Sequence, residues 1–370
     1  MGSFIDIVAG ARPNFMKVAP VLRALKARGG SATARLIHTG QHYDEGMSDV
    51  FFRQLGMPAP DVHLGAGSGT HGEQTAKILS SFERHLLSGE ARPRGVVVVG
   101  DVNSTIACSL AAVKLGIPVA HVEAGLRSYD RTMPEEINRL VTDAIADVLL
   151  VSEPAGIANL KKEGIPDSRI RFVGNLMIDS LVHQLESAKA LDYPGKIGLG
   201  KESYALVTLH RPSNVDEPER LKALVDFLLK IGESVRVVFP MHPRTREKLK
   251  QFDLENRLQQ TGRVKVLETL GYRENLSLMV GSRLVLTDSG GIQEETTYLG
   301  IPCLTLRSNT ERPVTVTLGT NTVVGNDLPR AEALVGDILN GRYKKGGAVE
   351  GWDGRAGERV ATALSEFWSL

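Results

Sequence analysis

The sequence has little cysteine, little net charge and no long hydrophobic run. Cys108 and Cys303 lie far apart in apolar segments, which excludes a disulfide framework or zinc-binding spacing and indicates two small buried side chains. A formal net charge of +1 argues against a protein that binds nucleic acid through bulk electrostatics, so any anion must be recognised locally. No segment approaches the roughly 18 apolar residues of a membrane helix, and the N-terminus lacks the parts of a signal peptide. We therefore expect a cytoplasmic protein without membrane contact.

What the sequence does contain is an alternation of short apolar runs and helical segments. Its 370 residues, 42% of them hydrophobic, suffice for two ordinary domains. β-Branched runs such as VVVVGD (96–101) and YALVTLH (204–210) are separated by amphipathic stretches such as LKALVDFLLKIG (221–232). Apolar strands alternating with helices predict parallel sheets covered on both faces. With right-handed crossovers this gives an α/β fold of two doubly wound, Rossmann-like domains.

The domain boundary is expected in a polar stretch rich in glycine and lysine, residues 185–203. We place the N-terminal domain at 1–178 and the C-terminal domain at 200–355, joined by a linker near 178–200. Residues 356–370 predict an amphipathic helix that can pack back on the N-terminal domain.

Polar clusters follow the apolar runs where the predicted strands end. They read GARPN, GQHYD, GDVNST and HVEAGLR in the first half, and HRPSN, MHPR, TDSGG and RSNTERP in the second. In open parallel sheets, ligands bind beyond the carboxyl ends of the strands. We therefore expect one ligand held in a cleft between the two domains.

The stretch VLTDSGGIQEETTY (285–298) predicts a strand, a glycine turn and a helix. Backbone N–H groups at Ser289, Gly290 and Gly291 can bind phosphate at the helix N-terminus. No Lys-Ser/Thr follows, which argues against a Walker A loop. A carboxylate one turn further can accept hydrogen bonds from ribose hydroxyls, so the stretch favours a nucleoside diphosphate, with Glu295 on the ribose. The alternative is a capping motif with solvent-facing glutamates, which suits Glu294 best.

Seven motifs together resemble the non-hydrolysing UDP-N-acetylglucosamine 2-epimerase family. They are GARPNFMKVAP (10–20), HTGQHYD (38–44), GDVNST (100–105), HVEAGLRS (121–128), MPEEINR (133–139), TDSGGIQEE and TERPVT (310–315). The match runs from about residue 4 to 326 in the family's order and spacing. The resemblance implies the GT-B architecture, two Rossmann-like domains around a cleft, and a homodimer.

The resemblance also implies the reaction, inversion of carbon 2 in UDP-GlcNAc to give UDP-ManNAc. UDP is eliminated to leave 2-acetamidoglucal and then adds back. No cofactor is expected, and a metal-free site is favoured because the pair His38 and His42 lacks an evident third ligand. The segment GSGTHG (67–72) formally matches a dinucleotide-binding pattern, but the residues before it make a poor strand, so we reject NAD binding and expect a flexible loop near the sugar.

Elimination of UDP requires cations on the diphosphate and carboxylates at the sugar. Arg12 and Lys17 follow the first predicted strand and can neutralise the diphosphate. By the family pattern, His210 contacts the diphosphate and Arg312 matches a UDP-contacting position. The carboxylates that form the implied acid/base set are Asp101, Glu123 and Glu135. For Glu136 and Arg139, a structural ion pair at a helix start is at least as good an interpretation as a catalytic role.

Some residues depart from the family pattern and leave the sugar nucleotide open. Ala11 and Asn14 replace Thr and Glu, and Asn275 stands where an apolar ring near the uracil is common. Relatives act on UDP-2,3-diacetamido sugars, which makes a modified hexosamine an alternative substrate. Positions Gln41 and His42 match the family's second, regulatory UDP-GlcNAc site.

Three other activities remain as alternatives. A GT-B glycosyltransferase shares the glycine-helix-glutamate site but usually needs one base and an acceptor, whereas this sequence offers three carboxylates. A hydrolysing epimerase would release free ManNAc and UDP. A nucleotide-sugar binding protein without activity is disfavoured, because Asp101, Glu123, Glu135 and His210 are all present.

Overall fold

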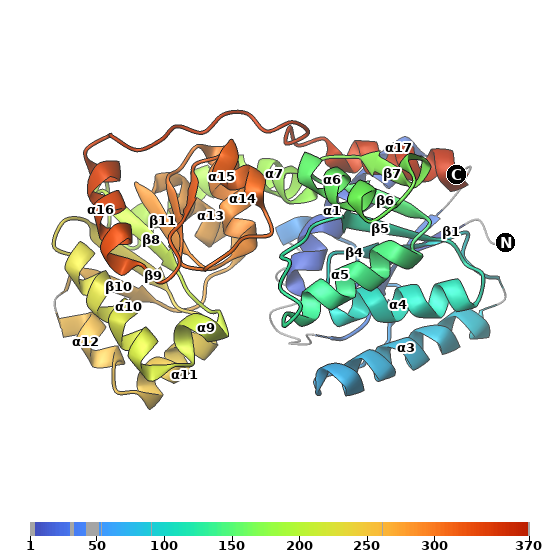
Figure 1. Ribbon diagram of the computed structural model, residues 1–370, viewed down its shortest axis with the longest axis horizontal. Helices are drawn as coiled ribbons and strands as arrows, with labels where there is room; N and C mark the ends of the chain where they lie inside the picture. The colour runs from blue at the N-terminus through green and yellow to red at the C-terminus, as the bar shows by residue number, and fades with distance from the viewer. Residues whose placement is uncertain are drawn as a thin grey trace. The chain divides into compact units, whose positions relative to one another are not determined.

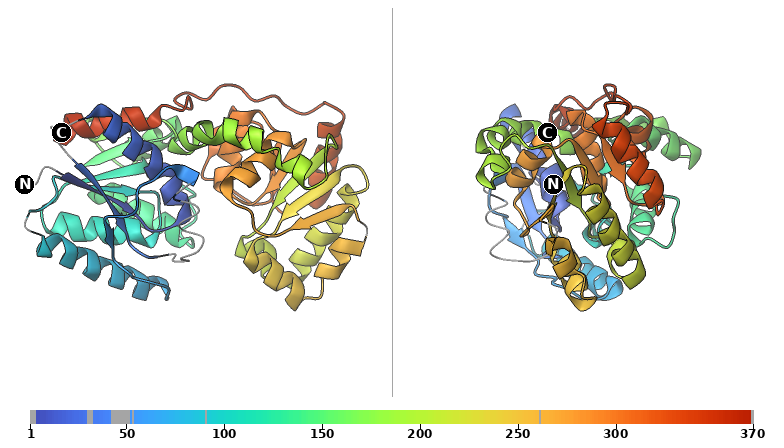
Figure 2. Two further views of the ribbon diagram at one scale, coloured as in Figure 1. Left: turned by 180° about the vertical axis from the view of Figure 1, so that it is seen from behind. Right: turned by 90° about the vertical axis from the view of Figure 1, so that its left-hand side faces the viewer.

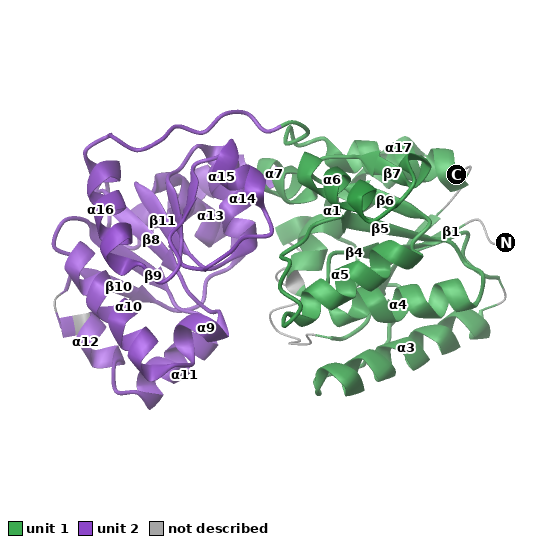
Figure 3. Ribbon diagram, viewed as in Figure 1, with its two compact units in different colours: residues 1–182, 350–370 green, residues 183–349 purple. Residues whose placement is uncertain are grey.

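The computed structural model describes residues 4–29, 33–41, 52, 54–89, 91–260 and 262–368, with only the backbone of Arg12 and Gln259 described. The chain forms two compact units (Figure 3). Unit 1 comprises residues 1–182 and 350–370, and unit 2 comprises residues 183–349.

Unit 1 contains, among its described residues, a seven-stranded sheet of parallel strands in the order β3-β2-β1-β4-β5-β6-β7 (Figure 1). Its strands are β1 (Phe4–Ala9), β2 (Thr33–His38), β3 (Val62–His63), β4 (Val96–Val99), β5 (Val119–Ala124), β6 (Val148–Val151) and β7 (Ile170–Phe172). Its helices are α1 (Arg12–Arg28), α3 (His71–Ser88), α4 (Asn103–Lys114), α5 (Pro134–Ile145), α6 (Pro154–Lys162), a 3-10 turn (Asp167–Arg169) and α17 (Ala356–Trp368). Helices α4 and α5 cover one face of the sheet, and α1 and α17 cover the other (Figures 1 and 2).

Unit 2 contains, in the part that the structure describes, a six-stranded parallel sheet in the order β10-β9-β8-β11-β12-β13. Its strands are β8 (Tyr204–Thr208), β9 (Arg236–Pro240), β10 (Val264–Leu267), β11 (Leu284–Thr287), β12 (Cys303–Thr305) and β13 (Asn321–Val323). Its helices are α8 (Tyr193–Lys196), α9 (Pro212–Val215), α10 (Pro218–Ile231), α11 (Pro243–Gln251), α12 (Glu255–Gln260), α13 (Tyr272–Gly281), α14 (Gly290–Leu299), α15 (Pro313–Thr317) and α16 (Leu328–Leu339). Two doubly wound parallel sheets confirm the predicted fold class.

The apolar strands are buried on both faces because successive side chains alternate between two cores. In β8, Ala205 and Val207 pack into a core that includes Leu224 and Leu228 of α10. Tyr204 and Leu206 of the same strand pack on the opposite face with Leu278 of α13. Continuous apolar runs therefore form central strands.

Both cysteines are buried with no measurable exposure, as the sequence indicates, and both thiols are free. Burial raises the pKa of the Cys108 thiol well above its ordinary value. Among the helices in the described ranges, none combines the length and the hydropathy that a membrane span requires.

The polar stretch near the domain boundary, residues 185–203, begins inside a helix. Helix α7 (Leu176–Leu191) includes its first residues, and the division between the units falls between Val182 and His183. Its Glu, Ala, Lys and Leu residues favour a helix, and Leu181 and Ala188 are buried.

The C-terminal helix α17 packs within unit 1. The backbone N–H groups of Ala356 and Gly357 donate to Asp179 over 3.0 and 2.7 Å, which caps the start of the helix. At its end, the Trp368 ring lies where a Cβ atom on Gly95 would stand, only 2.1 Å away. A glycine at position 95 is therefore required for this packing.

Each sheet has one point at which the strand order reverses, between β1 and β4 in unit 1 and between β8 and β11 in unit 2. Loops that leave the carboxyl ends of two such strands run in opposite directions and open a crevice, where ligands of doubly wound sheets bind. Residues that follow these four strands are therefore the first candidates for a functional site.

Candidate active site

In unit 1, polar side chains gather around Gly100, the residue after β4. Gly100 has φ +71°, and a Cβ atom there would lie 3.4 Å from Asn14 Nδ2 and Glu123 Oε2, and 3.5 Å from Lys17 Nζ. Glycine both adopts this left-handed backbone without strain and leaves room for the three side chains. The turn thereby brings residues from α1 and β5 to the carboxyl end of β4.

Lys17 and Glu123 form an ion pair, and each is only 8% exposed. Glu123 has φ +68°, at a register shift in β5 between Val122 and Ala124. This irregular backbone redirects a charged side chain within a buried strand. The structure thus places Lys17, predicted to face a diphosphate, against one of the predicted acid/base carboxylates.

Asp101 follows Gly100 at the end of β4, and Glu135 stands at the start of α5. The Asp101 carboxylate, 28% exposed, pairs with the guanidinium of Arg139. The backbone oxygen of Asp101 accepts a hydrogen bond of 2.8 Å from the side chain of Asn138. Glu135, the second residue of α5, is partly buried. Helix α5 therefore anchors the turn that carries Asp101.

Glu136 and Arg139 form the ion pair that the sequence suggests, over 2.9 Å. The Glu136 carboxylate, 1% exposed, also accepts hydrogen bonds from the backbone N–H groups of Ser128 and Tyr129, at 2.9 and 3.1 Å. Glu136 therefore fixes the loop after β5, whereas Arg139 reaches the candidate catalytic carboxylate.

Asn14 holds the turn after β1 against the end of β4. Its amide oxygen accepts from the N–H groups of Gly10 and Ala11, at 3.3 and 3.0 Å, and its amide nitrogen donates 3.0 Å to the carbonyl oxygen of Val99. A glutamate carboxylate at this position could not donate that last bond.

His121 is fully buried between Asp143 and the turn at Gly100. Its Nδ1 lies 2.6 Å from Asp143, and its Nε2 lies 2.8 Å from the carbonyl oxygen of Gly100. Burial alone would raise the pKa of Asp143, but His121 and Arg127 lower it below its ordinary value. With both ring nitrogens engaged in this way, His121 supports the Gly100 turn.

Of three further predicted residues, Gln41 is described at this edge of the sheet. Gln41 is buried, and its amide oxygen accepts from Ser104 N and Oγ at 3.0 and 2.7 Å, so it secures the start of α4. His42 and the side chain of Arg12 lie outside the described residues. Their predicted roles stay predictions.

In unit 2, His210 and Asp288 meet where β8 and β11 end. His210 Nδ1 lies 2.9 Å from Asp288 Oδ1, and the fully buried Asp288 also accepts from the N–H groups of His210 and Arg211 and from Asn214. Burial would raise the pKa of Asp288, but His210 and these donors lower it below its ordinary value. The buried carboxylate thereby orients a histidine ring whose side chain is 36% exposed.

Arg312 lies against the N-terminus of α14. Ser289 is the N-cap residue, and a Cβ atom on Gly290 would lie 3.8 Å from Arg312 Cζ. The partial positive charge of the helix end and the guanidinium therefore lie next to each other, which favours binding of an anion at this point. This brings together Ser289, Gly290, Gly291 and Arg312, all predicted to bind a nucleoside diphosphate.

The expectation that Glu294 faces solvent is wrong. Glu294 is 1% exposed, and its Oε1 lies 2.7 Å from Nε of Arg312. The loop that follows β12 and carries Arg312 returns to this face of α14, which the sequence around Glu294 does not reveal. Glu294 therefore holds the arginine in place.

Glu295 points instead toward α13. It is 3% exposed, and the Tyr272 hydroxyl donates a hydrogen bond of 2.8 Å to its Oε1. Burial raises the pKa of Glu295 to about 7, against the lowering effect of Tyr272. A buried carboxylate one turn beyond the anion site can read a hydroxyl-rich group such as ribose.

Several residues that support the site were not singled out from the sequence. Arg307 and Glu311 form a bidentate ion pair over 3.1 and 2.7 Å, and Thr310 donates 2.7 Å to Gln293 of α14. These contacts hold the loop that carries Arg312. Their only sequence signal is their place in RSNTERP, next to a predicted site residue.

The remaining candidates of the sequence do not join the site. The GSGTHG segment caps α3, where Thr70 and Glu73 form a capping box, and only the two-residue β3 precedes it. His38 is buried, and its Nδ1 accepts a 2.8 Å hydrogen bond from Gly40 N–H. Within the described ranges, no three His, Cys, Asp or Glu side chains are grouped as metal ligands.

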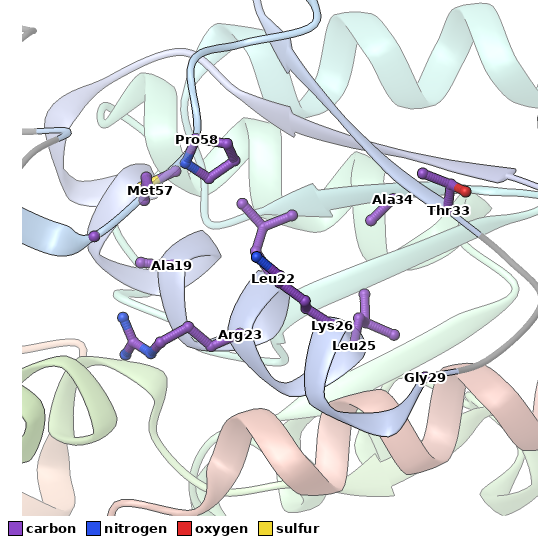
Figure 4. Close-up of a pocket in the computed structure, with 11 residues that line it drawn as sticks. Ala19, Leu22, Arg23, Leu25, Lys26, Gly29, Thr33, Ala34, Met57 and Pro58 are labelled. Atoms are coloured by element: carbon purple, nitrogen blue, oxygen red, sulfur yellow. The ribbon is translucent and has the colours of Figure 1, made fainter.

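A cavity of about 590 Å³ in unit 1 lies away from these strand ends. Figure 4 shows it beside the second half of α1, lined by Leu22, Arg23 and Lys26, with Thr33 at the amino end of β2. Its position opposite the carboxyl edge of the sheet separates it from the site described above.

Comparison with known proteins gives a match to one family and to solved structures. The family model described as UDP-N-acetylglucosamine 2-epimerase matches residues 23–365. The UDP-N-acetylglucosamine 2-epimerase of Methanocaldococcus jannaschii is 42% identical over 367 residues, covering 98% of both chains. A crystal structure of UDP-GlcNAc 2-epimerase from the same organism, in complex with UDP-GlcNAc and UDP, superposes with a TM-score of 0.89 and covers 98% of this chain and 99% of the other.

A relative whose name gives a different activity is almost as similar. The UDP-2,3-diacetamido-2,3-dideoxy-D-glucuronate 2-epimerase of Pseudomonas aeruginosa is 40% identical over 364 residues, covering 97% of this chain and 99% of the relative. Overall identity therefore does not separate the two sugar nucleotides.

Proposed function

The chain belongs to the UDP-N-acetylglucosamine 2-epimerase family, and from this premise we propose that it inverts carbon 2 of UDP-GlcNAc to give UDP-ManNAc. The observation that carries the proposal is the set of carboxylates at one edge of the unit 1 sheet. Asp101, Glu123 and Glu135 come from the end of β4, a bulge in β5 and the start of α5. Epimerisation needs a group that removes a proton from one face of the sugar and another that returns it to the opposite face.

The UDP moiety is assigned to unit 2. The diphosphate would lie at the N-terminus of α14, where Ser289, Gly290 and Gly291 supply N–H groups and Arg312 supplies a guanidinium. The ribose would then meet Glu295, which is five residues into the helix. In unit 1, Arg12 and Lys17 are proposed to add positive charge for the diphosphate.

The proposed reaction runs through elimination. The bond from carbon 1 to the UDP oxygen breaks with its electron pair leaving on the β-phosphate, while a carboxylate takes the carbon 2 proton. A double bond forms between carbons 1 and 2, giving 2-acetamidoglucal. UDP then re-forms the bond to carbon 1 as a second group delivers a proton to the other face of carbon 2.

His210 is the residue best placed to assist the departing diphosphate. Asp288 Oδ1 lies 2.9 Å from its Nδ1 and orients the ring, so Nε2 is the nitrogen left to meet a ligand. Nε2–H can then donate to a phosphate oxygen as negative charge develops on it.

The alternative substrate is a UDP-2,3-diacetamido hexosamine. It is favoured by the Pseudomonas aeruginosa relative, whose identity to this chain is nearly that of the Methanocaldococcus jannaschii enzyme. The family resemblance further suggests that the enzyme works as a homodimer.

The test is proton NMR of the purified protein incubated with UDP-GlcNAc alone. The proposal predicts signals of UDP-ManNAc at equilibrium with the starting material. A glycosyltransferase would give no epimer without an acceptor, and a hydrolysing epimerase would release ManNAc and UDP. No reaction with UDP-GlcNAc, but epimerisation of a 2,3-diacetamido analogue, would select the alternative substrate.

A further inference from the structure

The hydrogen bond from Tyr272 to Glu295 joins two helices on the same face of the unit 2 sheet. Tyr272 is the first residue of α13, and its hydroxyl donates 2.8 Å to Glu295 Oε1 on α14. Burial and the neighbouring Glu295 raise the pKa of Tyr272 well above its ordinary value, so the phenol keeps its proton throughout the physiological range. Glu295 therefore has a permanent donor on one oxygen.

This bond fixes the direction of the carboxylate. A glutamate side chain has three rotatable bonds, and a donor from a separate helix selects one arrangement among them. With Oε1 engaged, Oε2 is the oxygen left to accept from a ligand. Glu295 lies five residues beyond Gly290, which is about 7.5 Å along the helix axis from the anion site, a spacing suited to the ribose of a nucleoside diphosphate.

We propose that Tyr272 is a positioning residue for ribose recognition, which holds Glu295 so that one carboxylate oxygen reads the sugar hydroxyls of UDP. The inference rests on the proposed function in taking UDP as the ligand. It adds that selectivity for a ribonucleotide depends on a residue that does not touch the nucleotide.

The charge of Glu295 provides an independent readout. Its pKa is raised by burial, lowered by Tyr272 and raised by Glu294, while Glu294 is itself paired with Arg312. Removing the Tyr272 hydroxyl removes the one lowering contribution among these, so the pKa of Glu295 must rise from about 7. A larger fraction of Glu295 is then protonated at neutral pH, which weakens UDP binding in the variant. The lost affinity for UDP should return as the pH is raised.

The experiment compares UDP, 2′-deoxy-UDP and 3′-deoxy-UDP by calorimetry on the wild type and on Tyr272→Phe. Wild type should prefer UDP over at least one deoxy analogue, and the variant should bind UDP roughly 10-fold more weakly, as for a lost charge-assisted hydrogen bond. Its affinity for that deoxy analogue should change much less, so the preference shrinks. The pH below which UDP binding weakens should be higher for the variant than for the wild type. Ionisation of the UDP phosphates affects binding to both proteins equally, so it does not contribute to this difference.

Tyr204→Phe is the matched control. Tyr204 is also buried in unit 2, and its hydroxyl also donates to α13, to the carbonyl oxygen of Leu278. The control removes a structural bond to the same helix and should leave the preference for UDP intact. An unchanged preference and pH dependence in Tyr272→Phe, or an equal loss in Tyr204→Phe, would overturn the inference.

Failure of this inference is distinguishable from failure of the proposed function, because the readout is binding rather than turnover. A wild-type protein that binds UDP with ribose preference but forms no epimer would overturn the proposed function alone. Epimerisation with an unaltered ribose preference in Tyr272→Phe would overturn the inference alone.

Discussion

The carboxylate of Glu294 lies 2.7 Å from Nε of Arg312 at the N-terminal end of α14. Both side chains are almost fully buried, with 1% and 10% exposure. The guanidinium therefore stands beside the positive end of a helix dipole and is compensated by a carboxylate within that same helix. This relationship keeps a cation at the candidate diphosphate site when no ligand is bound.

Glu294→Gln should lower stability strongly, by about 3 kcal/mol, because it removes the negative charge that pairs with a buried arginine. Since the UDP diphosphate would replace the lost negative charge, UDP should raise the unfolding temperature more for the variant than for the wild type. Thermal and urea unfolding with and without UDP measure both effects. Glu358→Gln, which removes an exposed pair with Arg355, is the control and should change nothing measurable. A fully stable Glu294→Gln would contradict the role given to the pair.

Asp101→Asn should keep the fold and UDP affinity but lower turnover by about 100-fold or more, as expected for loss of an acid/base group. The amide can still receive a hydrogen bond from Arg139, so the turn after β4 should persist. Turnover by NMR and UDP affinity by calorimetry test this. Asp147→Asn, which alters an exposed carboxylate beside the amino end of β5, should have near-normal turnover. Near-normal turnover in folded Asp101→Asn would remove Asp101 from the mechanism.

Glu311 should make stability depend on pH. Burial would raise its pKa, but Arg307 and Arg312 lower it from 4.5 to about 2. A carboxyl group with a depressed folded pKa stabilises the protein above its unfolded pKa, and this contribution disappears as the pH falls through the folded value. Because a change of one in pKa corresponds to about 1.4 kcal/mol, we expect this lowering to contribute about 3 kcal/mol at pH 7.

Urea unfolding of the wild type and Glu311→Gln at several pH values checks this expectation. The difference in unfolding free energy should be full at pH 7 and shrink between about pH 4.5 and pH 2. Glu268→Gln, which removes an exposed partner of Arg246, should show no such pH-dependent difference. A difference that stays constant down to pH 2 would mean that packing, rather than charge, explains the effect.

The sequence predicts the fold and the places of the main candidates, because both depend on local pattern. VVVVGD places Asp101 after a buried strand, and TDSGG places Gly290 at a helix start, without knowledge of any long-range contact. The resemblance to a family then narrows the chemistry. His210 at the end of β8 follows from the same pattern.

Several pairings between side chains of the site could not be predicted, because they depend on contacts between segments that are distant in sequence. Lys17 and Glu123 are 106 positions apart, and their pairing depends on a bulge in β5. Glu294 was expected in solvent because nothing near it in sequence indicates that the Arg312 loop covers it. The same holds for Tyr272, whose hydroxyl reaches Glu295 from another helix.

The central claim, elimination and re-addition of UDP, is tested most directly by isotopes in one reaction. UDP-GlcNAc labelled with oxygen-18 at the bridge between carbon 1 and the β-phosphate is incubated with the wild-type protein in deuterium oxide. Solvent-exposed carboxylates exchange their protons with water faster than a typical enzyme turnover of about 10 per second. The account predicts a 2-epimer that carries deuterium at carbon 2, with the label scrambled into non-bridging positions of the β-phosphate. Epimer formed with no deuterium and with the label still in the bridge would contradict it.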